Sequence, residues 1–209
     1  EKCAELGIDM TDRIPVAPAA HYTVGGVKTD LTGRTNIPHL YVCGELASSG
    51  IMGANRLASN SLIECLVFGK RAVEDSVRNR REDPIPETMP LFSLDREKLD
   101  AYLSLKNKVA DIMTQEAGII RTENGLQEGL ETLLRLEQTE IFEENEYYSL
   151  VSKNLLTVAE LIIRSALFRK ESRGGHFRSD YPTPNDDYVC HIIQQKGKEI
   201  KTTPVILNN

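Results

Sequence analysis

The sequence predicts two regions of different architecture, an α/β region over residues 1–81 and an all-α three-helix bundle over residues 96–175. In the first region, short apolar runs alternate with glycines and small residues, which is typical of buried strands and tight turns. From residue 96 onward, apolar residues recur with the 3.6-residue period of amphipathic helices. Three prolines predict a linker over residues 82–95, and residues 176–209 form a predicted C-terminal tail.

Within the first region, a helix end is expected over residues 1–7. The glycine-containing segment at residues 32–35 predicts a turn, and residues 39–44 predict a short buried strand that ends at a glycine. A helix is then expected over residues 55–80. Its apolar residues cover most of its circumference, which is typical of a buried helix, so we expect this helix to lie within a larger domain.

Three stripes of apolar residues predict the three helices of the second region. They run from Leu99 to Met113, from Leu126 to Ile141 and from Tyr148 to Ala166. Short connections between helices of this length favour an antiparallel bundle, and the charged residues between the stripes are expected to face solvent.

The tail contains two β-like runs, at residues 188–194 and 205–207. The segment Arg173-Gly174-Gly175-His176 before it is interpreted as a helix end, with glycine as the C-cap. His39 and His191 are interpreted as structural histidines.

Composition and charge exclude several classes of protein. Hydrophobic residues make up 40% of the 209 residues and charged residues 27%, which is enough apolar material for a sizeable core. The net charge of −6 argues against a nucleic-acid binder, which would carry a basic face. No apolar run approaches the roughly 20 residues of a membrane span, and no secretory signal opens the chain, so no membrane partner is expected.

The four cysteines indicate neither disulfides nor a metal site, because they form no CxxC pair and no cluster of Cys and His provides metal ligands. We therefore expect reduced thiols, a cytoplasmic location and no bound metal. The chain begins with Glu1 rather than Met, which we interpret as a fragment or a processed chain.

The first constellation with chemical potential is His21 followed by the pair Gly25-Gly26. Paired glycines let the backbone pass close to another group or adopt positive φ, so the histidine could be held against an anionic ligand and donate a hydrogen bond to it. A structural histidine in a turn explains the same residues, and both interpretations stay open at this point.

The second constellation is Gly44-Glu45 followed by residues 50–64, where a strand ends, a small-residue loop follows and a helix begins. A helix N-terminus offers unpaired N–H groups and a partial positive charge to an electron-rich acceptor such as a phosphate or a reduced flavin. Arg56 adds a planar fork suited to a carboxylate, and Glu45 could accept from ribose-like hydroxyls. The competing interpretation is an N-cap cluster, in which Asn55, Ser59 or Ser61 satisfies the helix N–H groups and Arg56 forms a salt bridge.

A dinucleotide cofactor would need a pyrophosphate loop from outside this sequence. No GxGxxG follows a predicted strand, and no GxxxxGK[ST] is present.

Four motifs, in order along the chain, resemble one family: HYTVGGV, LYVCGE, GANRLASNSLIECLVFG and ESRGGHFRSDYP. They are similar to the C-terminal part of the L-aspartate oxidases, within the fumarate reductase and succinate dehydrogenase flavoprotein superfamily. The resemblance covers about residues 13–183. One departure is Val24, where the family often has cysteine; valine fills a similar volume.

The resemblance implies that the first region is the remnant of an FAD-binding domain. It implies that His21 and Arg56 bind the substrate dicarboxylate over the flavin. It also implies that Glu45 contacts the FAD ribityl chain, and that Ser61 and Leu62 lie near the pyrimidine edge of the isoalloxazine ring. The family's proton-handling arginine and the glycine-rich FAD turn are expected upstream, so no catalytic residue is assigned within this chain.

The family reaction converts L-aspartate to iminoaspartate by hydride transfer to FAD, with reoxidation by oxygen or fumarate, and feeds quinolinate and NAD biosynthesis. Because an N-terminal FAD-binding region and a capping region are missing from this sequence, we expect the chain alone to be inactive. Two alternatives are a fumarate reductase or succinate dehydrogenase flavoprotein subunit, which substrate profiling would separate, and a helical interaction module whose flavin motif is vestigial.

Overall fold

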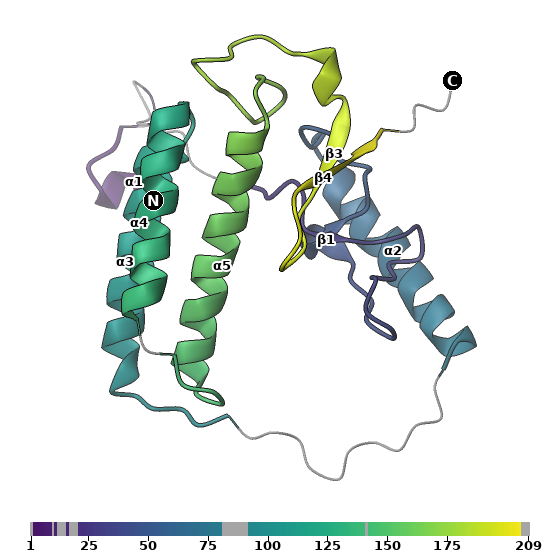
Figure 1. Cartoon of the computed structure of the whole chain (residues 1–209), viewed down its shortest axis with the longest axis horizontal. Helices are drawn as coiled ribbons and strands as arrows, with labels where there is room; N and C mark the ends of the chain where they lie inside the picture. The colour runs from purple at the N-terminus through teal and green to yellow at the C-terminus, as the bar shows by residue number, and fades with distance from the viewer. Residues whose placement is uncertain are drawn as a thin grey trace. The chain divides into compact units, whose positions relative to one another are not determined.

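The computed structural model describes residues 2–9, 11, 16, 21–80, 92–140 and 142–205, and it divides the chain into two compact units, Glu1–Asn79 and Arg80–Asn209. The predicted linker lies outside the described residues as far as residue 91. Figure 1 labels the helices and strands of both units.

The first unit contains one long helix and one short parallel pair of strands. Strand β1 pairs with β2, with Val27 opposite Ala47, and the 3₁₀ helix η1 immediately precedes β2. The elements of this unit are α1 (Lys2–Glu5), β1 (Val27–Lys28), η1 (Gly44–Leu46), β2 (Ala47–Ser48) and α2 (Asn60–Arg78).

The predicted strand at residues 39–44 is wrong. Tyr41 makes an isolated antiparallel bridge to Arg34, and the chain then enters η1. His39 adopts a φ of 65°, which interrupts an extended segment at its start. Val42 is buried, so the apolar pattern identified a core position correctly but not its backbone conformation.

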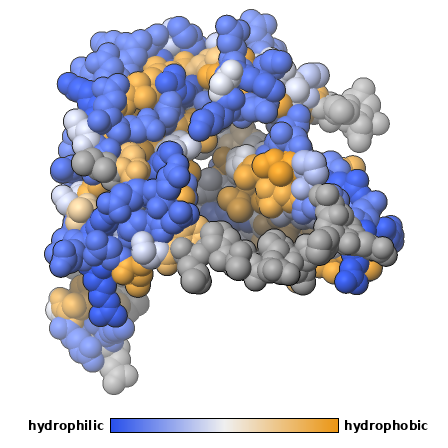
Figure 2. Space-filling view, turned by 60° about the horizontal axis from the view of Figure 1, so that its bottom comes forward, coloured by the Kyte–Doolittle hydropathy of each residue, from blue (hydrophilic) through white to orange (hydrophobic). Residues whose placement is uncertain are grey.

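Helix α2 begins at Asn60, five residues later than predicted, because Ser59 adopts a left-handed φ of 69°. Within this unit Phe68 and Ala72 are the buried apolar residues of α2 among those described, and the burial of its other faces in a larger domain stays a prediction. Figure 2 shows hydrophobic side chains at the molecular surface. On α2 the exposed apolar residues are Leu62, Ile63, Leu66, Val67, Val73 and Val77.

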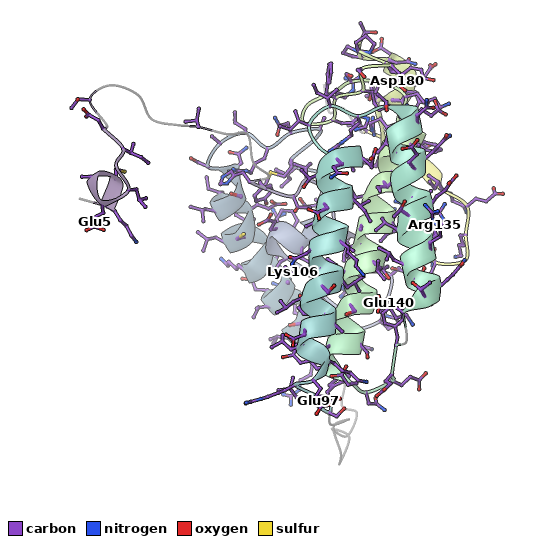
Figure 3. All side chains as sticks on the ribbon, turned by 90° about the vertical axis from the view of Figure 1, so that its left-hand side faces the viewer. Glu5, Glu97, Lys106, Arg135, Glu140 and Asp180 are labelled. Carbon is purple, nitrogen blue, oxygen red and sulfur yellow. The ribbon has the colours of Figure 1, made fainter. Side chains whose placement is uncertain are left out.

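The second unit contains three long helices that run side by side and pack on one another (Figures 1 and 3). They are α3 (Lys98–Glu116), α4 (Glu123–Thr139) and α5 (Tyr147–Phe168). Charged side chains such as Lys106 and Arg135 are exposed on their outer faces (Figure 3). Their shared core consists of Leu105, Val109, Ala117, Leu126, Leu133, Leu156, Ala159, Ile163 and Ala166.

Local signals fix where these helices begin and how closely they cross. The hydroxyl of Thr122 caps α4 by accepting from Gly125 N at 3.1 Å, and the Glu146 carboxylate caps the start of α5. A Cβ on Gly129 would lie 3.0 Å from Glu116 Cβ and 3.1 Å from Ile163 Cδ1. Glycine at this position therefore permits the close approach of all three helices.

The tail forms an antiparallel hairpin of β3 (Cys190–Ile193) and β4 (Lys201–Pro204), preceded by the 3₁₀ helix η2 (Asp186–Tyr188). The prediction over residues 188–194 is confirmed by β3. Strand β4 ends at Pro204, just before the predicted run at residues 205–207. Val205 is not part of a strand, and residues 206–207 lie outside the described part of the chain.

Candidate functional site

Both glycines at residues 25–26 have left-handed backbone, and Gly26 also makes a close approach to a second backbone segment. Gly25 and Gly26 have φ values of 101° and 140°. A Cβ on Gly26 would lie 2.2 Å from the carbonyl oxygen of Leu46 in η1, closer than any side chain tolerates. Gly26 therefore lets the chain that follows His21 and Tyr22 lie against η1, and its close contact is with protein backbone.

Glu45 lies in η1 and reinforces the same attachment. Its Oε1 accepts a hydrogen bond from the backbone N–H of Thr23 at 2.8 Å, and the side chain is exposed. One edge of the carboxylate thus orients the loop. Among the described residues no group donates to its other oxygen, which can accept from a hydroxyl-bearing ligand.

Arg56 has no carboxylate partner among the residues that the structure describes. Its guanidinium carbon lies 4.5 Å from the centre of the Tyr22 ring, and Nη1 donates to Ser61 Oγ at 3.2 Å. The salt-bridge interpretation of Arg56 is therefore not supported there. Tyr22 directly follows His21, which is exposed, so the loop with the predicted substrate histidine contacts the predicted substrate arginine.

The N-terminus of α2 has no side-chain cap. Ser59 precedes the helix in a left-handed conformation and accepts no capping hydrogen bond. Because the first N–H groups of a helix lack intrahelical partners, those of Ser61 and Leu62 remain available to an acceptor. Ser61 uses its hydroxyl to accept from Arg56, and the Leu62 side chain is 72% exposed.

Two acidic residues contribute to the electrostatics around Tyr22, and sequence reasoning missed one of them. Glu64 is only 4% exposed and accepts from the hydroxyl of Ser49. Burial raises the pKa of Tyr22, and the charges of Glu64 and Glu45 raise it further. The sequence did carry a signal for Glu64, because it lies four residues before Phe68 and therefore on the same buried face of α2.

These groups fit a flavin cofactor. An uncapped helix N-terminus and a guanidinium with no carboxylate partner in the described part of the chain present donors and positive potential on one short stretch of sequence. That is the chemistry required next to the electron-rich edge of a flavin and a dicarboxylate substrate.

In the second unit, the segment after α5 forms a paired network of charges. The buried guanidinium of Arg178 donates through Nε and Nη2 to both oxygens of Asp180, at 2.7 and 2.6 Å, and through Nη1 to the Ala166 carbonyl at 3.0 Å. The hydrogen bonds from Arg178 lower the pKa of Asp180 to about 2. Asp180 also accepts from Glu123 N at 2.9 Å, which ties the segment to the start of α4.

Glu171 is fully buried in the same segment and is satisfied by several donors. Arg169 and Arg173 form ion pairs with its carboxylate, and Asn185 N donates to it at 2.9 Å. Burial raises the pKa of Glu171, but these hydrogen bonds outweigh it and hold the pKa below its usual value. The charges in this segment are therefore explained by structure.

The interpretation of residues 173–176 as a helix end is wrong. Helix α5 already ends at Phe168, and Arg173 and His176 form a tight turn with Gly174 at a φ of 59°. His176 Nδ1 lies 2.8 Å from Arg121 Nη1 and accepts from it, and Nε2 donates to the Arg169 carbonyl at 3.1 Å.

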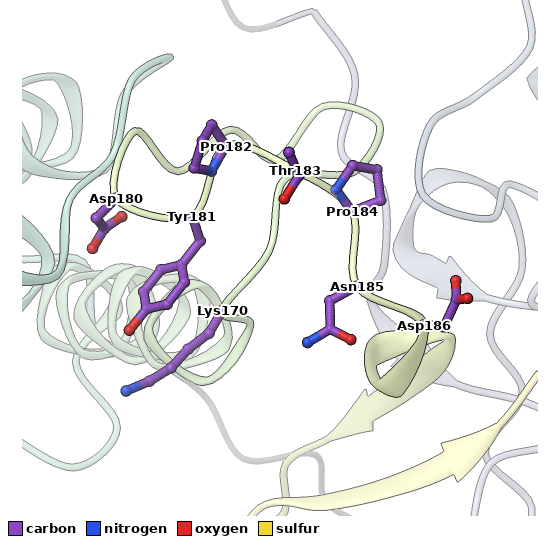
Figure 4. Close-up of a pocket in the computed structure, with 8 residues that line it drawn as sticks. All are labelled: Lys170, Asp180, Tyr181, Pro182, Thr183, Pro184, Asn185 and Asp186. Atoms are coloured by element: carbon purple, nitrogen blue, oxygen red, sulfur yellow. The ribbon is translucent and has the colours of Figure 1, made fainter.

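A shallow hollow in the second unit is lined by Lys170 and residues 180–186 (Figure 4). Asp180 is committed to Arg178, and the Lys170 ammonium lies 5.8 Å from the centre of the Tyr181 ring. Two of its charged groups are therefore already in contact with other side chains, and we do not assign the hollow a ligand.

Metal and membrane signals are lacking in the described part of the chain. No group of three or more Cys, His, Asp or Glu side chains there is placed to hold a metal ion. None of the helices described there combines the length and apolar composition needed to cross a bilayer. The four cysteines are free.

Two family models cover most of the sequence. The FAD-binding domain model matches residues 1–62, and the model of the fumarate reductase flavoprotein C-terminus matches residues 106–209. The L-aspartate oxidase of Nostoc sp. strain PCC 7120 is 39% identical over 93% of this chain and 39% of its own length. The chain belongs to the L-aspartate oxidases, within the fumarate reductase flavoprotein family.

A second L-aspartate oxidase, from Pseudomonas aeruginosa, is 41% identical over 87% of this chain and 36% of its own length. The chain thus spans about two fifths of the length of these curated L-aspartate oxidases. FAD is the cofactor indicated by the matching domain model.

Solved structures show a fumarate reductase-like fold. FrdA of E. coli quinol fumarate reductase superposes with a TM-score of 0.74 at 29% identity, over 99% of this chain and 40% of FrdA. Sdh1 of Mycobacterium smegmatis superposes with a TM-score of 0.65 at 27% identity, over 88% of this chain and 35% of Sdh1. The α/β region and the helical region are therefore parts of a flavoprotein fold.

Proposed function

We propose that this chain is the C-terminal part of an FAD-dependent L-aspartate oxidase that converts L-aspartate to iminoaspartate in the cytoplasm. Oxygen or fumarate reoxidises the flavin, and iminoaspartate supplies quinolinate and NAD biosynthesis. In this proposal residues 1–81 complete the FAD-binding domain, residues 82–95 are a linker, residues 96–175 form a three-helix bundle, and residues 176–209 form a tail.

The observation that carries the proposal is the environment of Arg56. A half-buried guanidinium without a carboxylate partner among the described residues is costly unless a ligand supplies the counter-charge. A dicarboxylate supplies it, because a carboxylate accepts two parallel hydrogen bonds from the guanidinium fork. His21, at the end of the loop that contacts Arg56, binds the second carboxylate.

The start of α2 provides the cofactor contacts. FAD, when bound, supplies the hydride acceptor. The N–H groups of Ser61 and Leu62 stabilise negative charge that develops next to the helix N-terminus, without reorganising, because their direction is fixed by the helix. Glu45 accepts from the hydroxyls of the ribityl chain.

The chain on its own is proposed to be inactive. The sequence contains no glycine-rich GxGxxG pyrophosphate turn, and the family's proton-handling arginine is expected upstream. The exposed apolar residues of α2 agree with this, since such a surface is normally covered by further protein.

A second candidate is the flavoprotein subunit of a fumarate reductase or succinate dehydrogenase, which the superposition on FrdA favours. Steady-state assays on the full-length flavoprotein separate the two. L-Aspartate oxidation with release of peroxide supports the oxidase. Turnover of succinate or fumarate without any oxidation of L-aspartate contradicts it.

A flavin titration of the 209-residue chain tests whether this polypeptide needs an upstream region to bind FAD. We expect no tight, stoichiometric binding of FAD by this polypeptide. A stoichiometric complex would contradict the proposed need for an upstream region.

A further inference from the structure

We infer that Tyr22 is a positioning residue that holds the Arg56 guanidinium ready for the substrate carboxylate. This inference deepens the proposed function and rests on it. Arg56 has a long flexible side chain, so its usefulness as a carboxylate fork depends on what fixes it before substrate arrives.

Two contacts at different parts of the guanidinium fix its orientation. The Tyr22 ring lies at 4.5 Å from the guanidinium carbon, which is within the range of a cation–π contact. Ser61 Oγ accepts from Nη1 at 3.2 Å. The ring restrains the position of the guanidinium carbon, and the hydroxyl restrains the position of Nη1. The N–H groups that remain can bind a carboxylate.

Tyr22 is itself held by the backbone on its C-terminal side. Thr23 N donates to Glu45 at 2.8 Å, and Gly26 approaches the Leu46 carbonyl so closely that no side chain fits between them. The ring therefore stands on a segment fixed against η1, and it can act as a support for Arg56.

The Tyr22 ring leaves the positive charge of Arg56 available to a substrate carboxylate. Glu45 and Glu64 are the acidic residues that act on Tyr22, but Glu45 accepts from Thr23 N and Glu64 accepts from Ser49. The raised pKa of Tyr22 keeps its phenol uncharged at neutral pH. An uncharged ring attracts a guanidinium without neutralising it, whereas a carboxylate at this position would compete with the substrate.

The test uses the full-length flavoprotein with FAD bound. Fumarate is titrated while the flavin absorbance is followed, and KM and kcat for L-aspartate are measured in parallel. Tyr22→Leu removes the ring face, and Tyr22→Phe is the matched control that removes only the hydroxyl. We expect Tyr22→Leu to raise the fumarate Kd and the L-aspartate KM about tenfold, and Tyr22→Phe to stay within about twofold of wild type. FAD content stays the same.

Replacing Tyr22 with pentafluorophenylalanine keeps the ring shape but removes the negative potential of its face, and it is expected to weaken fumarate binding several-fold relative to Tyr22→Phe. This measurement decides the matter if the leucine variant does not fold.

Three outcomes in the Tyr22 variants overturn the inference on its own. The first is an unchanged fumarate Kd in the folded Tyr22→Leu variant. The second is equal fumarate affinity in the pentafluorophenylalanine and Tyr22→Phe proteins. Loss of binding in Tyr22→Phe equal to that in Tyr22→Leu would assign the effect to the hydroxyl. A wild-type flavoprotein that shows no response to fumarate and no oxidation of L-aspartate overturns the proposed function, and this inference with it.

Discussion

The charged segment after α5 and the loop before α2 use arginine in opposite ways. At residues 169–185, Arg178 binds Asp180 through two hydrogen bonds, and Glu171 is held between arginines. Before α2, Arg56 contacts an aromatic ring and a hydroxyl, with no carboxylate among the described residues.

The difference separates structural charges from ligand-binding charges. A buried charge is tolerated when an opposite charge and hydrogen bonds satisfy it, and the first segment meets that requirement within the chain. In the second, a half-buried guanidinium has no carboxylate partner among the described residues, so we expect its counter-charge from a ligand. The comparison can be tested by removing one charge from each segment and measuring function and stability separately.

The largest effect is expected from Arg56. Arg56→Ala in the full-length flavoprotein should lower kcat/KM for L-aspartate by about 10²- to 10³-fold, because it removes the partner of a substrate carboxylate in a desolvated site. Arg56→Lys should recover only part of this loss, because lysine keeps the charge but not the fork. Steady-state kinetics measure both variants.

Arg78→Ala is the control for Arg56, since it removes an exposed arginine from the other end of α2. It should leave kcat/KM unchanged. A folded Arg56→Ala enzyme with wild-type kinetics would show that the unpaired guanidinium has no role in substrate binding, and it would favour a vestigial motif.

Glu171→Gln should change stability and leave the substrate site intact. The substitution leaves Arg169 and Arg173 without their buried carboxylate and is expected to lower the free energy of unfolding by about 3 kcal/mol. Thermal unfolding measures the loss, and Glu137→Gln on the exposed face of α4 provides the control. If Glu171→Gln were as stable as this control, the structural role assigned to residues 169–185 would be contradicted.

A smaller, pH-dependent effect is expected at His176. Burial lowers its pKa, and the charges of Arg121, Arg169 and Arg178 lower it further, against the effect of the Arg169 carbonyl. The neutral form is therefore favoured in the folded state. The stability that neutral His176 contributes is fully present above the pKa of about 6.5 in the unfolded chain. It is lost as the pH falls through the pKa of His176 in the folded chain.

Urea unfolding at a series of pH values measures this dependence. On acidification below pH ~6.5, the free energy of unfolding should fall by about 1 kcal/mol, which is the scale of one hydrogen bond. His176→Gln should show a flatter profile, while His191→Gln, which leaves the contact with Arg121 intact, should keep the wild-type profile. Equal profiles for all three proteins would exclude a role for the His176–Arg121 hydrogen bond.

Sequence reasoning was most successful where local periodicity determines the structure. The apolar stripes located α3, α4 and α5 to within a few residues, because each helix buries one face against the other two. The strand at residues 39–44 and the start of α2 were misplaced. Both errors come from left-handed backbone at His39 and Ser59, which carry no sequence signal as strong as glycine.

The candidate site was only partly accessible to sequence reasoning. Arg56 stood out at the predicted helix start, whereas the roles of Ser61 and Leu62 came from the family resemblance. Tyr22 and Glu64 did not stand out, since their roles depend on contacts between segments far apart in the sequence. The sequence also could not distinguish a glycine pair against a ligand from one against the Leu46 backbone.

The most direct test of the central claim is an experimental structure of the full-length flavoprotein with FAD and a bound dicarboxylate. We predict that the Arg56 guanidinium binds one carboxylate with the Tyr22 ring still on its face, and that the N–H groups of Ser61 and Leu62 point at the pyrimidine edge of the flavin. A dicarboxylate bound away from Arg56, or a flavin remote from the start of α2, would contradict the account.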